Sequence, residues 1–181
     1  MAYIQACPVE INGFGYLDRL TGTTERFVLD DVVILQQSAT GVSVDVSAEA
    51  VAQHMTEVLL AGGDTGRMRL QWHSHVNMPA YFSGTDLANI EAYRGDWMIS
   101  MVLNKRGEYE LRLDVFKPFR AWTPLKLVID MQADPAVIAA CRNDIADKVT
   151  IKKLFRSKAV ETADVDIVPV SPDDLVVEAL P

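Results

Sequence analysis

The order of apolar and polar residues predicts a chain in which strands and helices alternate. Apolar residues spaced by three and four positions predict a helix over 47–61, with Val51, Met55, Val58 and Leu59 on one face. Gly62-Gly63 follow and end it. Short apolar or alternating runs between turn residues predict strands over 9–17, 26–36, 68–75, 97–103, 108–116 and 125–131. Further helices are expected to begin at Ser83 and near Pro135.

The succession of these elements indicates the fold class. The turn at 104–107 joins two expected strands as an antiparallel hairpin, whereas strand–helix–strand successions elsewhere allow parallel neighbours. We therefore expect an α/β domain with a mixed β-sheet flanked by helices. A core over 1–118 would be completed by a strand and a helix over 119–160. Residues 161–181 form an expected acidic C-terminal tail, because they hold six acidic residues, no basic residue and three prolines.

Composition and charge exclude several classes of function. The chain has 181 residues, 49% of them hydrophobic, with 17 Lys and Arg against 25 Asp and Glu, a net charge of −8. This balance argues against nucleic acid and against an anionic membrane surface as partners. No apolar run approaches the ~18 residues of a spanning helix, and no signal peptide is visible. Two cysteines make no disulfide framework, so we expect a cytoplasmic protein.

Two histidines in one strand are the first chemical feature. His73 and His75 are two positions apart, which places both imidazoles on one face of the strand, about 6.5–7 Å apart along the chain. Asp86, in the first turn of the following helix, is placed to return a third ligand. Two imidazoles and a carboxylate suit Zn²⁺, and three protein ligands leave the fourth position for water, as in catalytic sites.

Each of these residues also has a simpler explanation. The two histidines alone are compatible with a polar patch, Ser83 and Asp86 with a capping box, and Glu10 with a solvent-facing carboxylate. Their co-occurrence favours the metal site. The metallo-β-lactamase arrangement would need Asp where the chain has Asn77, and amidohydrolase or cupin sites need further histidines. Only His54 remains, and it is assigned a structural role beside the first helix, as Cys7 is assigned to packing.

The complete pattern resembles that of a known enzyme family. Glu10-Ile11-Asn12-Gly13, then His73-Ser74-His75, then seven residues, then Ser83-x-x-Asp86 is similar to the motif of the JAMM (MPN, JAB-type) zinc metalloproteases. The resemblance covers about 9–116 and lies with the minimal prokaryotic or viral branch. It implies a single MPN-like domain and one Zn²⁺ per chain, held by His73, His75 and Asp86 with a catalytic water as fourth ligand. It further implies that Glu10 takes the proton of that water and that Ser83 donates a hydrogen bond to the oxyanion.

The resemblance also implies a function. It predicts a zinc-dependent isopeptidase or peptidase that hydrolyses the bond after the C-terminal tail of a ubiquitin-like protein, in deconjugation or precursor processing. Two alternatives stay open: a phage-type JAMM peptidase acting on tail or cell-wall substrates, and a non-catalytic, zinc-free MPN scaffold. We expect the substrate tail to pair with a sheet edge at 77–82 or 97–104. The apolar stretch 78–82 would line a narrow channel that prefers a Gly-Gly end.

Overall fold

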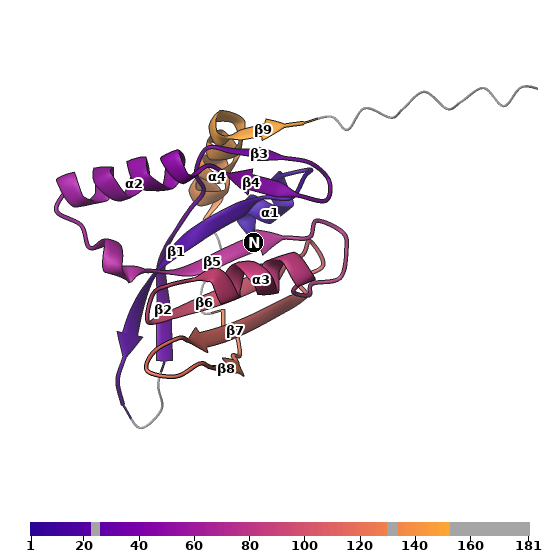
Figure 1. The fold of residues 1–181 in the computed structure, drawn as a ribbon. Helices are drawn as coiled ribbons and strands as arrows, with labels where there is room; N and C mark the ends of the chain where they lie inside the picture. The colour runs from indigo at the N-terminus through magenta and orange to yellow at the C-terminus, as the bar shows by residue number, and fades with distance from the viewer. Residues whose placement is uncertain (23–25, 130–133, 153–181) are drawn as a thin grey trace, which may run out of the picture.

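The computed structural model describes residues 1–22, 26–129 and 134–152, which form a mixed α/β fold (Figure 1). A six-stranded sheet has the order β2-β1-β5-β6-β7-β8, and a three-stranded sheet has the order β4-β3-β9. The strands of the large sheet are β1 (Asn12–Leu20), β2 (Arg26–Val33), β5 (Met68–Ser74), β6 (Trp97–Leu103), β7 (Tyr109–Val115) and β8 (Ala121–Pro124). Those of the small sheet are β3 (Gln37–Ala39), β4 (Val44–Val46) and β9 (Val149–Ile151). The helices are α1 (Ala2–Ala6), α2 (Ala48–Leu60), η1 (Thr65–Arg67), α3 (Gly84–Ala92) and α4 (Pro135–Lys148).

The large sheet is mixed, as expected. β5 and β6 pair in parallel, and the other neighbours in this sheet pair antiparallel. Side chains alternate across β5, so Leu70 and Trp72 enter the buried core together with Ile4 of α1, while Gln71 and His73 face the opposite side. That opposite side is where α3 lies across the sheet (Figure 1). The alternation therefore separates the packing face of β5 from the face that carries the candidate chemistry.

Several local predictions are confirmed. Ser47 caps α2 by accepting a hydrogen bond from the Ala50 N–H, and Gly62 follows the helix with a φ of 76°. The predicted hairpin is the β6–β7 pair, with Gly107 at a φ of 81° in its turn. Both glycines occupy the left-handed region, which they enter at low cost because they lack a Cβ.

Other local predictions are wrong. In the strand predicted over 125–131, residues 125–129 form no strand and residues 130–131 lie outside the described ranges. The last strand of the large sheet among the described residues is β8, which pairs with β7. The first strand begins at Asn12 rather than at residue 9, because the chain at Glu10 bonds to the loop after β3: the Glu10 N–H donates to the Thr40 carbonyl at 3.1 Å. Leu59 is 59% exposed, outside the half-buried face of α2.

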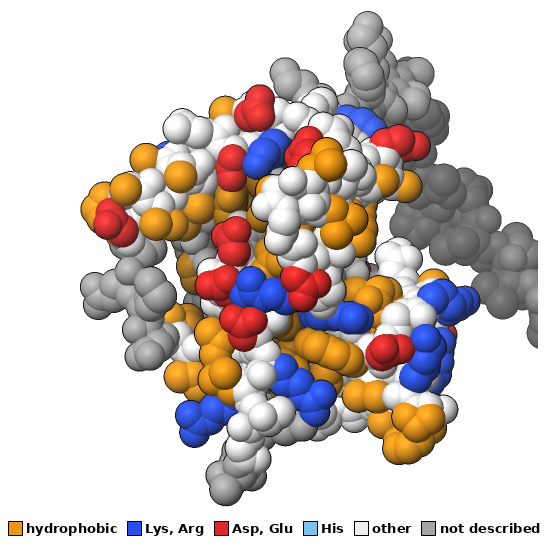
Figure 2. Space-filling view, turned by 90° about the vertical axis from the view of Figure 1, so that its left-hand side faces the viewer, with side chains coloured by type: hydrophobic (Ala, Val, Ile, Leu, Met, Phe, Trp, Pro, Cys, Tyr) orange, Lys and Arg blue, Asp and Glu red, His pale blue; other side chains and the backbone are white. Residues whose placement is uncertain are grey.

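The exposed surface near α2 combines charge with apolar side chains. Figure 2 shows acidic and basic side chains gathered at the middle of this face and apolar ones along its upper left. Arg67 of η1 pairs with Asp18 at 2.9 Å and with Asp30 at 2.8 Å.

Among the described residues, none of the helices has the length and apolar character of a membrane span. The predicted acidic tail, 161–181, lies outside these ranges.

Candidate metal centre

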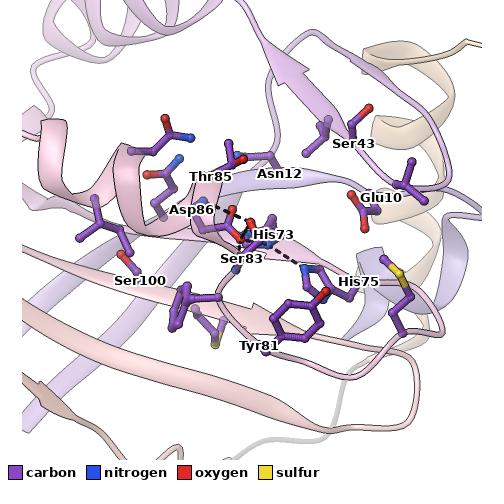
Figure 3. A pocket seen from close by; sticks show the side chains of 18 residues that line it. Glu10, Asn12, Ser43, His73, His75, Tyr81, Ser83, Thr85, Asp86 and Ser100 are labelled. Carbon is purple, nitrogen blue, oxygen red and sulfur yellow. Dashed lines mark hydrogen bonds and ion pairs between the residues drawn. The ribbon is translucent and has the colours of Figure 1, made fainter. Parts of the chain in front are cut away.

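The structure brings the three predicted metal ligands together. His73 lies near the end of β5, His75 directly follows that strand, and Asp86 lies in the first turn of α3. The Nε2 atom of His73 is 3.2 Å from Nε2 of His75 and 3.6 Å from Oδ2 of Asp86 (Figure 3). All three ligand atoms lie within 4.8 Å of one another. Zinc bonds of roughly 2.0–2.1 Å in a tetrahedron put neighbouring ligand atoms about 3.3 Å apart, so the cluster fits the ion in spacing and donor type.

Hydrogen bonding and burial prepare both imidazoles as ligands. Nδ1 of His75 lies 2.8 Å from the Pro79 carbonyl, which accepts its proton and leaves the lone pair on Nε2, inside the cluster. Burial lowers the pKa of His73, against the opposing charge of Asp86. The neutral imidazole is the form that binds a metal, so His73 needs no proton loss at neutral pH.

Ser83 and Asp86 form the capping box that begins α3. The Ser83 Oγ accepts from the Asp86 N–H at 3.2 Å, and Oδ2 of Asp86 accepts from the Ser83 N–H at 2.7 Å. The Ser83 hydroxyl also donates to this Oδ2 at 2.6 Å. The capping and metal interpretations are therefore compatible, because the cap holds the carboxylate oxygen that faces His73.

Glu10 lies in the same cavity as the three ligands. The cavity has a volume of about 300 Å³, and Glu10 is only 5% exposed within the fold. Burial raises the pKa of Glu10 to about 7, with Asp86 adding to the rise and His75 opposing it. A carboxylate with this pKa can both accept and release a proton near neutral pH.

Two polar side chains that the sequence did not predict support the site through hydrogen bonds to neighbouring main-chain groups. The Gln37 amide accepts from the Asn12 N–H at 2.9 Å and donates to the Asn12 carbonyl at 3.0 Å, which joins β3 to β1 opposite His73. Asn104 is fully buried and donates to the Met78 carbonyl at 2.8 Å, in the loop that carries the carbonyl partner of His75. Asn104 was expected only as a turn residue, and no local pattern distinguishes Gln37.

Three polar or reactive residues lie away from the candidate ligands, and two of them, Cys7 and His54, were expected to be structural. Ser74 is 1% exposed and its Oγ accepts from the Ile11 N–H at 3.1 Å, on the core side of β5. Cys7 belongs to the hydrophobic core. His54 on α2 contacts the Tyr16 hydroxyl at 2.8 Å.

Neither predicted segment is a sheet edge in the structure. Residues 97–103 are β6, which pairs with β5 on one side and with β7 on the other. Residues 77–82 form no strand, and the carbonyls of Asn77 and Met78 accept hydrogen bonds from Arg106 and Asn104. A tail that binds by strand pairing therefore needs another edge.

The cavity holds three side chains that can bind a metal ion together with the Glu10 carboxyl and the Ser83 hydroxyl, the combination of groups that metal-assisted hydrolysis requires. Neither the comparison with protein-family models nor that with curated proteins finds a match to this chain.

Proposed function

We propose that the protein is a zinc-dependent peptidase of the JAMM type that hydrolyses the bond after the C-terminal tail of a ubiquitin-like protein. The observation that carries the proposal is the convergence of His73, His75 and Asp86 at zinc-compatible spacings, in one cavity with a buried Glu10. Each of these four residues is part of the motif that resembles the JAMM family. In this proposal the α/β fold is MPN-like, the protein is cytoplasmic and residues 161–181 form an acidic tail.

The roles of the side chains follow from their positions. Bound at the three ligands, zinc would supply a Lewis acid that polarises the scissile carbonyl and makes water acidic near neutral pH. Glu10 accepts the water proton and returns it to the leaving nitrogen. The Ser83 hydroxyl, which now donates to Asp86, turns to the developing oxyanion, a contact worth about 3 kcal/mol in comparable sites.

The size of the cavity supports a small, extended substrate end. A volume of about 300 Å³ lies at the lower limit of ligand pockets and admits few side chains beside the main chain. Met78, Tyr81 and Phe82 are among its lining residues. A Gly-Gly end fits such a site better than an end with a branched residue.

The test uses ubiquitin-like proteins that carry C-terminal fusions. The zinc-loaded protein is incubated with a panel of them and the cut site is determined by mass spectrometry. We expect one cut, directly after Gly-Gly, and loss of cleavage when the last Gly is replaced by Val. Cleavage of unrelated unfolded peptides at many sites would instead support the phage-type or general peptidase. Absence of bound zinc after reconstitution would support the scaffold.

A further inference from the structure

The small sheet has an open edge beside the candidate metal centre. In the order β4-β3-β9, β9 covers one side of β3 and β4 covers the other. β4 has no second strand neighbour within the part of the chain that the structure describes. The main-chain groups on its outer side therefore have no strand partner among these residues, as at the edge of a sheet.

The register of the hairpin shows which groups these are. The Thr40 N–H donates to the Ser43 carbonyl at 2.8 Å, so the alternation of an antiparallel pair makes Ala39 and Val44 a pair without mutual hydrogen bonds. In such a pair both residues direct their N–H and C=O groups outward. The Lys152 N–H confirms this for Ala39, because it donates to the Ala39 carbonyl from the β9 side at 2.8 Å. Val44 consequently directs its N–H and C=O away from β3.

This edge opens onto the cavity at the end where Glu10 lies. Val42, Ser43 and Val44 line the same cavity as the metal ligands. In Figure 3, Ser43 and Glu10 lie at one end of it and Ser100 at the other. The bond from the Glu10 N–H to the Thr40 carbonyl fixes the hairpin beside Glu10.

We propose that the edge of β4 binds the peptide that follows the scissile bond, so that the preferred substrate is a linear precursor. The inference rests on the proposed function, in which Glu10 returns the proton to the leaving nitrogen and the leaving group therefore lies at the Glu10 end. In the hydrolysis, the water oxygen bonds to the carbonyl carbon, the C–N bond breaks and the water proton reaches the leaving nitrogen through Glu10. A peptide after that nitrogen offers main-chain groups to Val44. A lysine side chain offers four methylene groups there instead.

The first test compares leaving groups on one ubiquitin-like protein with the zinc-loaded enzyme. Linear fusions ending in one to five residues after Gly-Gly are compared with a lysine isopeptide conjugate. Two main-chain hydrogen bonds predict that kcat/KM rises about tenfold between one and three residues and then levels off. The isopeptide conjugate should match the one-residue fusion. An isopeptide conjugate cut as fast as the longest fusion, or no dependence on length, would overturn the inference.

Matched changes on both partners test the edge itself. Val44→Pro removes the outward N–H at an edge position, where proline is tolerated, and should abolish the gain with length. Val44→Ala shortens the side chain, keeps the N–H and should preserve the gain within about twofold. N-methylation of successive amides in the leaving peptide makes the same test without altering the protein, and one methylated position should lose the gain. If none does, β4 is not the docking edge.

A binding experiment separates this inference from the proposed function. A Glu10→Gln variant loaded with zinc is mixed with the five-residue fusion, and hydrogen exchange of the Val44 amide is followed. Protection of Val44 in this variant supports docking at β4. If the zinc-loaded wild-type protein then cleaves none of the fusions, that result refutes only the proposed function. Unchanged exchange at Val44 with a saturating fusion would refute docking.

Discussion

Glu10→Gln should change how the stability of the metal-free protein depends on pH. Burial raises the pKa of Glu10 from 4.5 to about 7, so between these values the folded protein holds a proton that the unfolded chain has lost. Folding stability contributed by this group therefore falls as pH rises through that window. Glutamine has no proton to lose, so the variant escapes the fall.

The shift in pKa sets the size of the effect. A rise from 4.5 to about 7 corresponds to about 3 kcal/mol, complete above about pH 7. The difference in unfolding free energy, variant minus wild type, should consequently grow by about 3 kcal/mol between about pH 4.5 and pH 8. This change with pH is independent of any constant effect of the substitution on packing.

Urea unfolding of chelator-treated protein, followed by tryptophan fluorescence, measures the difference at each pH. Glu91→Gln is the control, because it alters a carboxylate on the exposed side of α3, and its difference should change by less than about 0.5 kcal/mol. Zinc should reduce the effect at Glu10, since a nearby cation favours the carboxylate. If the difference in unfolding free energy for Glu10→Gln changes by less than about 1 kcal/mol over this pH range, the argument that burial raises the pKa of Glu10 is refuted.

Three further predictions test the centre and its support. Reconstituted protein should hold about one zinc per chain by elemental analysis, and well under half an equivalent would contradict the site; alanine at any ligand should sharply lower the content. The three predicted ligands are His73, His75 and Asp86. Asn104→Ala should lower the unfolding free energy by about 2–4 kcal/mol and should lower the zinc affinity about tenfold in chelator competition. Unchanged values would show that the Asn104 hydrogen bonds do not support the loop that contains Met78. Gly13→Ala should lower the unfolding free energy measured in urea by about 2–3 kcal/mol, because its Cβ would lie 2.5 Å from the Trp72 ring. Gly84→Ala is the control, since its Cβ would meet no atom within 4 Å. Equal effects of the two substitutions would contradict this packing.

The ligand cluster was predictable because each of its parts depends on local geometry. Strand alternation separates His73 from Ser74, and a helix that begins at Ser83 presents Asp86 one turn later. The hairpin after β6 and the end of α2 were predictable for the same reason, since glycine marks both turns.

The small sheet was not predictable in this way. Its strands have three residues each, too few for a periodic pattern, and β9 joins β3 across more than a hundred residues. The position of Glu10 depends on this sheet through Thr40, and its burial depends on the whole cavity. Sequence spacing therefore identified the residue types at the site but not the open edge of β4.

The candidate site is attached to two different sheets, so in the proposed function zinc binding and proton transfer depend on different parts of the fold. The ligands belong to the large sheet and α3, whereas the chain at Glu10 is bonded to the β3–β4 hairpin of the small sheet. A local opening of the small sheet, which has few hydrogen bonds to break, would displace Glu10 while His73, His75 and Asp86 keep their spacing. In the proposed function, zinc content would then stay constant while turnover falls, so full metal loading would not by itself demonstrate full activity.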